Sequence, residues 1–364
     1  MELVIRPTGT TPIHNCMLFI KDSGSGLNFS RAIGLDGTEG KTVTVDHRFR
    51  TGSITKLFTS TLILQFVEEG LLKTNDPYFN LIDDNSKKLL SGLHLLHGID
   101  YSSTISLHHL LNHSSGLRDY FSEDERFLNF VLEHPLHVWD WKGVMEQYFQ
   151  YGLNKKPAFI PGSGFHYADT NYLLLAVLIE QITGKPIHQV YREKIISPLG
   201  LTSTYLEFYE MPDEVKPIVY PFYGMHSLEK INTSFDWGGG GLVSTMNDLD
   251  IFIRSLMKGD LFKKPESLAL MLQLQNQKPL AESNSEVFHY GLGIQKKGFS
   301  GFSFFGHNSA YASMLYYEPE KDISLILSLN QLTAIHKAEW MMKKIILECK
   351  KLSASDNYCH STPK

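Results

Sequence analysis

The sequence is poor in cysteine, in long apolar runs and in positive charge. Its three cysteines, Cys16, Cys349 and Cys359, are too few for a disulfide framework, and they suit a reducing compartment. No apolar run reaches the length of a membrane span. The net charge of −5 offers no basic face to nucleic acid. These features exclude a disulfide-rich scaffold, a membrane-spanning protein and a nucleic-acid-binding protein.

The N-terminus also lacks the pattern of a secretory signal. Residues 1–7 show no positive stretch followed by an apolar core and a small-residue cleavage site. We therefore expect a soluble, cytoplasmic protein. A periplasmic or secreted chain whose signal peptide has been removed has the same appearance, so this alternative stays open.

Motifs for metals are missing as well. The 16 histidines are scattered, and the sequence contains neither H-E-x-x-H nor a paired C-x-x-C. The densest group is His108, His109 and His113, which we interpret as a histidine-rich helix end or loop. We expect no metal and no cofactor.

The chain is long enough for a sizeable core, with 364 residues of which 42% are hydrophobic. Periodicity predicts strands at both ends and helices in the middle. The strand candidates are residues 14–20, 27–33, 42–46, 290–296, 303–306, 312–318 and 323–330. The helix candidates run from Ser53 to a stop at Gly70, and over 105–112, 123–133, 138–151, 172–183, 191–199, 245–256 and 335–352. Four consecutive glycines, 238–241, argue against a helix or a central strand there.

This order predicts an α/β (α+β) sandwich. Strands from the two ends can share one mainly antiparallel sheet flanked by helices, into which an all-helical domain is inserted. We expect residues 1–75 and 236–352 to form the sheet domain, 76–235 the helical domain and 353–364 a disordered polar tail. The cleft between the two domains is the expected active site.

The segment Arg50–Phe58 carries the first chemical signal. Ser53 and Lys56 are three residues apart at the start of an apolar helix, so both lie on one side of it. A serine hydroxyl needs a neighbouring base, and a desolvated lysine can act as one. A helix N-terminus adds N–H groups that favour negative charge. The alternative is a capping serine beside a solvated lysine.

Two further segments complete a possible catalytic set. Tyr167 lies in a loop just before the apolar helix 172–183, where its phenol can project into a cleft and ionise beside an ammonium group. His307 lies in a late strand, within Gly306–Ser309, which can offer a backbone N–H to an oxyanion. Each residue also has a structural alternative, as a packed tyrosine or a buried histidine.

Taken in this order, the motifs resemble the serine β-lactamase and penicillin-binding protein superfamily. The resemblance covers about residues 14 to 350 and is closest to the class C branch, with its D-alanyl-D-alanine carboxypeptidases, D-aminopeptidases and family VIII esterases. It rests on residues 49–56, 110–117, 161–184, 239–245 and 306–309. The resemblance implies a β-lactamase/transpeptidase-like fold.

It also implies roles for individual residues. Ser53 would be the nucleophile, and Lys56 would hold or take its proton. Tyr167 would be the general base in acylation and then the acid for the leaving group. The N–H groups of Ser53 and Ala310 would form the oxyanion hole. His307 would orient Tyr167 or bind a substrate carboxylate.

The sequence departs from the family pattern on the substrate-binding side. Asp169 replaces the usual asparagine of the tyrosine motif; a carboxylate only accepts hydrogen bonds, and it favours a charged Lys56. Asn308 and Ser309 replace the usual threonine or serine and glycine, and the segment to Glu318–Pro319 is shorter than usual. These changes argue against an efficient β-lactamase, and they bear on the oxyanion hole and the peptide-binding edge.

Two functions remain as hypotheses. The first is a serine hydrolase that acts through an acyl-enzyme on a small ester, amide or D-amino-acid peptide, with a small molecule or short peptide as its partner. The second is a catalytically impaired relative that binds a ligand or partner without turnover. The sequence does not decide the oligomeric state.

Overall fold

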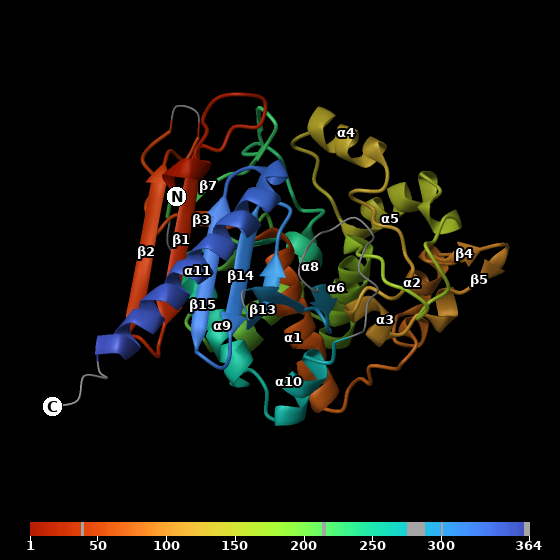
Figure 1. The fold of residues 1–364 in the computed structure, drawn as a ribbon. Helices are drawn as coiled ribbons and strands as arrows, with labels where there is room; N and C mark the ends of the chain where they lie inside the picture. The colour runs from red at the N-terminus through yellow and green to blue at the C-terminus, as the bar shows by residue number, and fades with distance from the viewer. Residues whose placement is uncertain (38–39, 213–215, 275–287, 300, 360–364) are drawn as a thin grey trace.

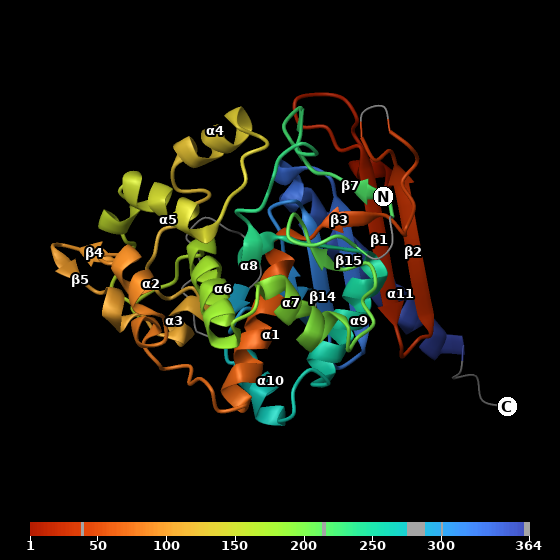
Figure 2. The same ribbon diagram turned by 180° about the vertical axis from the view of Figure 1, so that it is seen from behind.

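The computed structural model describes residues 1–37, 40–212, 216–274, 288–299 and 301–359. A large sheet with helices on both faces forms one side of the molecule, and a group of helices and loops forms the other (Figure 1). Helix α1 (Thr55–Glu68), which begins beside Ser53, lies between the two sides in both views (Figures 1 and 2).

The large sheet is antiparallel throughout and joins the two ends of the chain. In spatial order it contains β11 (Phe288–Tyr290), β12 (Gln295–Phe299), β13 (Phe302–Asn308), β14 (Ser313–Glu318), β15 (Ile323–Leu329), β1 (Asn15–Asp22) and β2 (Leu27–Gly34). The pairing of β1 with β15 sets Cys16 opposite Leu329. This confirms the prediction that strands from both ends share one mainly antiparallel sheet.

Helices bury both faces of this sheet. Met17 and Phe19 of β1 belong to the core that contains α1 and α9 (Met246–Lys258). Leu18 and Ile20 belong to the second core, which lies under α11 (Ile335–Cys359). Because successive strand side chains point to opposite faces, one strand contributes to both cores. Figure 2 shows the sheet between these helices.

A second, small sheet leads into the Ser53 segment. Its order is β6 (Tyr205–Leu206), β10 (Leu242–Ser244), β3 (Arg48–Arg50) and β7 (Ile218–Val219). The strand predicted at residues 42–46 is wrong, since only Thr42 makes an isolated bridge, to Leu35. The N–H of Thr44 instead donates to His47 Nδ1 at 3.0 Å, which closes a turn before β3.

The middle of the chain is mainly helical. It contains α2 (Asp84–Leu89), α3 (Leu107–Leu111), α4 (Glu125–Glu133), α5 (Trp141–Gln150), α6 (Asp169–Thr183), α7 (Ile187–Tyr191) and the short hairpins β4 (Leu95–Leu96) with β5 (Ile99–Asp100) and β8 (Phe222–Tyr223) with β9 (His226–Ser227). Helix α6 packs against α1 and α3. Because β6 and β7 also come from residues 76–235, the division of the chain at residues 75 and 236 stays a prediction.

The glycine stretch corrects one prediction. Residues Trp237–Gly240 form a single helical turn, α8, where the glycines argued against a helix. A Cβ at Gly238 would lie 2.5 Å from Ala176 Cβ and 3.1 Å from the Tyr172 carbonyl oxygen. The glycine is therefore explained by close packing of this turn on α6, which outweighs the intrinsic cost of glycine in a helix.

The C-terminal end corrects a second prediction. After α10 (Pro265–Met271) and the late strands, α11 continues through Cys359, beyond the expected end at residue 352. The expected disordered tail is therefore helical over residues 353–359, and residues 360–364 lie outside the described part. No glycine or proline follows residue 352 until Pro363, so nothing in the local sequence ends the helix earlier.

Within the described residues, no helix combines the length and the apolar character that crossing a bilayer requires. Helix α1 is almost fully buried along its length, yet it has only 14 residues. Its apolar character therefore reflects its place at the centre of the core.

Candidate active site

Ser53 lies in the short 3-10 turn Gly52–Ile54, directly between β3 and α1. Gly52 has a φ of +53°, and a Cβ there would lie 2.1 Å from Ser309 Oγ and 2.9 Å from Tyr311 Cδ2. Only glycine allows the turn to pack this closely against the segment that follows β13. The nucleophile candidate is thus held against the end of that strand.

Lys56 lies one turn further along, and its side chain has an exposed fraction of 0%. Its Nζ donates to Ser53 Oγ at 3.0 Å and to the Gly239 carbonyl oxygen at 2.8 Å. It also forms an ion pair with Asp169 Oδ1. Three acceptors match the three N–H bonds of an ammonium group, so this arrangement favours a charged lysine that donates to the serine oxygen.

The Tyr167 ring completes the group. Its centroid lies 5.0 Å from Lys56 Nζ and 4.2 Å from the centroid of the His113 ring. The Tyr167 hydroxyl is buried and interacts with the Ser53 hydroxyl, but it makes no well-formed hydrogen bond among the described residues. A buried hydroxyl without a well-formed hydrogen bond is costly in a folded protein, and a bound substrate can relieve that cost.

The pKa of Tyr167 differs from the expectation. Burial, and then the negative charge of Asp169, raise this pKa well above its usual value, while the nearby Ser53 hydroxyl lowers it. The sequence had suggested easy ionisation beside the lysine ammonium. Because Lys56 is paired with Asp169, its charge does not offset the burial of the phenol. Tyr167 is therefore a neutral phenol in the resting site.

His307 of β13 is also neutral. Its Nδ1 lies 2.6 Å from the Asn308 carbonyl oxygen, which can only accept, so Nδ1 carries the proton. Its Nε2 lies 3.0 Å from the Tyr290 hydroxyl and accepts from it. Burial, and then Lys56, lower the pKa of His307 to about 3. With both nitrogens occupied and no charge, His307 is poorly suited to bind a substrate carboxylate.

His113 belongs to the same network, although the sequence interpretation treated it as part of a helix end. Its Nδ1 accepts from the Ala168 N–H at 3.2 Å and from Asn171 Nδ2 at 3.0 Å. Its Nε2 lies 3.2 Å from the Tyr290 hydroxyl. His113 thus links the residue after Tyr167 to the residue that orients His307. The sequence signal that could have identified His113 is the segment 110–117, which contributes to the family resemblance.

A second member of the histidine group, His109, serves the fold. His109 forms a capping box with Ser106 at the start of α3. In the part of the chain that the structure describes, no group of three or more His, Cys, Asp or Glu side chains is arranged to hold a metal ion.

The end of β13 lies beside the nucleophile. The Ala310 residue is exposed in the turn after the strand, and its N–H has no hydrogen-bond partner in the described ranges. Ser309 is buried and its Oγ accepts from the Tyr311 N–H at 3.1 Å, so its side chain packs on Gly52. Asn308 Oδ1 accepts from Gln295 Nε2 at 2.9 Å, which leaves the Asn308 amide nitrogen for a ligand.

Three carboxylates surround the single lysine. Asp119 accepts from the Asp169 N–H at 2.8 Å at the start of α6, and Asp236 Oδ2 accepts from the Tyr311 hydroxyl at 2.7 Å. Burial, and then Asp169, raise the pKa of both Asp119 and Asp236 to about 7. The site therefore carries more potential negative charge than Lys56 can balance.

We expect Asp236 to make the protein less stable as the pH rises toward about 7. The unfolded chain ionises this carboxyl near its ordinary pKa of 3.8, whereas the folded chain keeps the proton until about 7. The stabilising contribution of Asp236 to the folded state is therefore fully present below pH 3.8 and is lost above about pH 7. In the Asp236→Asn variant this loss disappears. The Tm of the variant relative to the wild type should rise between about pH 4 and pH 7 and stay level above that.

Thermal unfolding at several pH values tests this expectation. Asp322→Asn is a suitable control. Asp322 also accepts a hydrogen bond from a tyrosine hydroxyl, that of Tyr317, at 2.7 Å, but its pKa is lowered instead of raised. A difference in Tm between Asp236→Asn and the wild type that does not change with pH would contradict the assignment of a raised pKa.

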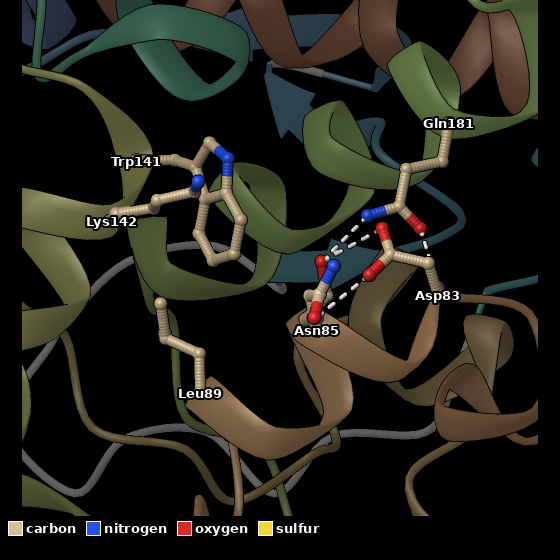
Figure 3. A pocket seen from close by; sticks show the side chains of 7 residues that line it. Asp83, Asn85, Leu89, Trp141, Lys142 and Gln181 are labelled. Atoms are coloured by element: carbon tan, nitrogen blue, oxygen red, sulfur yellow. Dashed lines mark hydrogen bonds between the residues drawn. The ribbon is translucent and has the colours of Figure 1, made fainter.

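A cavity of about 310 Å³ lies away from this group of residues. It is lined by Asp83, Asn85, Ser86, Leu89, Trp141, Lys142 and Gln181 (Figure 3). Asp83 is occupied in capping α2 through the N–H of Ser86, and Gln181 donates to Ser86 Oγ at 2.8 Å. Gln181 lies near the far end of α6 from Asp169, so this cavity is separate from Ser53.

The sequence and the fold are similar to those of known proteins. A family model described as Beta-lactamase matches residues 24–343. The D-alanyl-D-alanine-carboxypeptidase/endopeptidase AmpH of Escherichia coli (strain K12) is 27% identical over 221 residues, 60% of this chain and 51% of that protein. Monacolin J acid methylbutanoyltransferase of Aspergillus terreus is 25% identical over 292 residues, 72% of this chain and 67% of that protein. The chain therefore spans about half the length of the first relative.

A solved structure shows the same fold. The D-stereospecific amidohydrolase from Streptomyces sp. superposes with a TM-score of 0.72 and 27% identity. The match covers 88% of this chain and 90% of that one, so it includes both the sheet and the helical side.

Proposed function

The chain belongs to the beta-lactamase family, and from this premise we propose that it is a serine hydrolase acting on a small ester, amide or D-amino-acid peptide. One observation carries the proposal. Lys56 Nζ lies 3.0 Å from Ser53 Oγ, and the Tyr167 ring, whose buried hydroxyl interacts with Ser53, lies beside that same nitrogen. A nucleophile, a cation and a proton carrier are thus collected at one buried point.

In acylation, Ser53 Oγ bonds to the substrate carbonyl carbon, and the bond to the leaving group breaks. The serine proton passes to the Tyr167 oxygen while the Tyr167 proton passes to the leaving amine or alcohol. A neutral phenol performs this exchange without first ionising, which agrees with its raised pKa. Lys56 remains an ammonium group and stabilises the charge that develops on Oγ.

Deacylation reverses the proton path. A water molecule attacks the ester carbon and gives its proton to Tyr167, which returns a proton to Ser53 Oγ as the acid product leaves. In both steps the backbone N–H groups of Ser53 and Ala310 would hold the oxyanion. The exposed, unpartnered N–H of Ala310 supports this role.

The charges of the site favour a substrate with a free amine over one with a free carboxylate. The side chain of Asp169, beside Lys56, is 16% exposed. Asp236 lies close enough to Asp169 that the negative charge of Asp169 helps to raise the pKa of Asp236. His307 is neutral, and Arg50 is committed to Glu207 at 2.7 Å. A substrate ammonium would therefore gain a carboxylate partner, whereas a carboxylate would gain repulsion.

We expect a phenylalanyl ester to be hydrolysed about tenfold more efficiently than its 3-phenylpropanoyl counterpart, which lacks only the amine. One favourable charge contact of about 1.4 kcal/mol accounts for this ratio. The measurement is kcat/KM for both esters, in the wild type and in Asp169→Asn. The preference should shrink in the variant. Equal efficiency on both esters in the wild type would remove the amine-binding role.

The alternative is a ligand-binding relative without turnover, and a labelling experiment separates the two. A fluorophosphonate or fluorescent penicillin probe should label the wild type, and a panel of nitrocefin, short-chain esters and D-alanyl peptides should show hydrolysis of at least one member. If the wild type shows no labelling and hydrolyses no member of the panel, the result would favour the binding protein. The cytoplasmic location remains a prediction from the sequence.

A further inference from the structure

We propose that Tyr311 and Asp236 form a positioning pair that holds the two oxyanion N–H groups at their working separation. The inference rests on the proposed function, because it assumes that the Ser53 and Ala310 N–H groups bind the oxyanion. Among the described residues, neither Tyr311 nor Asp236 forms a hydrogen bond with Ser53, so both would act through the backbone that they brace.

Tyr311 contacts both halves of the oxyanion hole. It directly follows Ala310, and its N–H donates to Ser309 Oγ at 3.1 Å, which closes the turn around Ala310. Its ring packs on Gly52, the residue before Ser53, where an added Cβ would lie 2.9 Å from Tyr311 Cδ2. One buried ring therefore separates the two backbone segments by a fixed distance.

Asp236 anchors the other end of this side chain. The Tyr311 hydroxyl donates to Asp236 Oδ2 at 2.7 Å. The Asp236 carbonyl oxygen accepts from the Gly239 N–H at 2.8 Å, and the Gly239 carbonyl accepts from Lys56 Nζ. The pair thus joins the end of β13 to the turn that holds the lysine. A misplacement of about 1 Å in such a constellation can cost about a hundredfold in rate.

The test uses Tyr311→Phe, which keeps the ring against Gly52 and removes the hydroxyl. We expect kcat for the best ester of the panel to fall by about 10- to 100-fold with KM changed less than about threefold. The affinity for a boronic acid, which forms a tetrahedral anion on the serine, should fall by a similar factor. A role in stability alone would lower Tm but leave both of these quantities unchanged.

The chain offers a matched control in Tyr317→Phe. The Tyr317 hydroxyl donates to Asp322 at the same distance of 2.7 Å, on the neighbouring strand β14 and away from Ser53. This variant should keep its kcat and its boronate affinity.

The second test variant is Asp236→Ala. The double variant Tyr311→Phe/Asp236→Ala should be no slower than the slower of the two single variants, because both substitutions remove the same interaction.

The outcomes separate this inference from the proposed function. If Tyr311→Phe and Asp236→Ala both keep wild-type kcat and boronate affinity while the wild type turns over, the positioning pair is wrong and the hydrolase stands. If the wild type neither turns over nor binds the boronate, the proposed function itself fails. If one variant does not fold, the other carries the test.

Discussion

Replacing Ser53 by alanine is expected to lower esterase activity by at least about 10³-fold and to abolish labelling by a fluorophosphonate. The substitution removes one oxygen atom, Ser53 Oγ, which accepts a hydrogen bond from Lys56 Nζ at 3.0 Å. The fold should survive, because Ser53 lies in a short turn and caps no helix through its side chain. Steady-state kinetics and gel fluorescence measure the two effects.

Ser163→Ala is the control for this variant. Ser163 is exposed, and its Oγ donates only to the nearby Ile160 carbonyl oxygen at 2.7 Å. Its activity and labelling should match those of the wild type. Retained labelling in Ser53→Ala, at the same rate as in the control, would mean that another residue is the nucleophile.

Tyr167→Phe should lower the acylation rate by about two orders of magnitude or more, as the loss of a general acid–base group can. The ring that packs at 4.2 Å from His113 is kept, and only the hydroxyl that interacts with Ser53 is lost. Stopped-flow measurement of the acylation burst with a p-nitrophenyl ester gives the rate.

Tyr148→Phe provides the comparison. The Tyr148 hydroxyl is also buried without a well-formed hydrogen bond among the described residues, but it belongs to α5 and is not among the residues collected around Ser53. Its removal should leave the burst unchanged. A burst in Tyr167→Phe as fast as that in Tyr148→Phe would exclude the phenol from the proton path.

Much of the fold could be predicted from the sequence because its signals are local. The apolar runs at residues 14–20 and 27–33 predicted strands that exist as the paired β1 and β2, and the apolar helix predicted after Ser53 exists as α1. The three-residue spacing placed the Lys56 amine beside the Ser53 hydroxyl, as a helical turn requires. Such features depend on neighbours in the chain.

Features that depend on distant packing were not predicted. The glycines of the helical turn Trp237–Gly240 are explained by the close approach of α6, and no local sequence pattern predicts that approach. The pKa of Tyr167 depends on burial and on Asp169, which outweigh the neighbouring ammonium group. Likewise, Tyr290 enters the site only because β11 brings its hydroxyl to His307 and His113.

The positioning residues form a third group that the sequence did not reveal. Asp236 and Tyr311 belong to no motif that was singled out for its chemistry, and they are 75 positions apart. Only the structure shows that one hydrogen bond joins them across the site. A motif therefore identified the reacting groups but not the residues that fix the distances between them.

The most direct test of the account is the mass of the covalent intermediate. The wild-type protein is mixed with a p-nitrophenyl ester, quenched in acid within the burst and digested for peptide mass spectrometry. The account predicts one acyl group, on the peptide that contains Ser53, and none on the matching peptide of Ser53→Ala. Turnover of the ester without any acylated peptide, or an acyl group on a different residue, would contradict it.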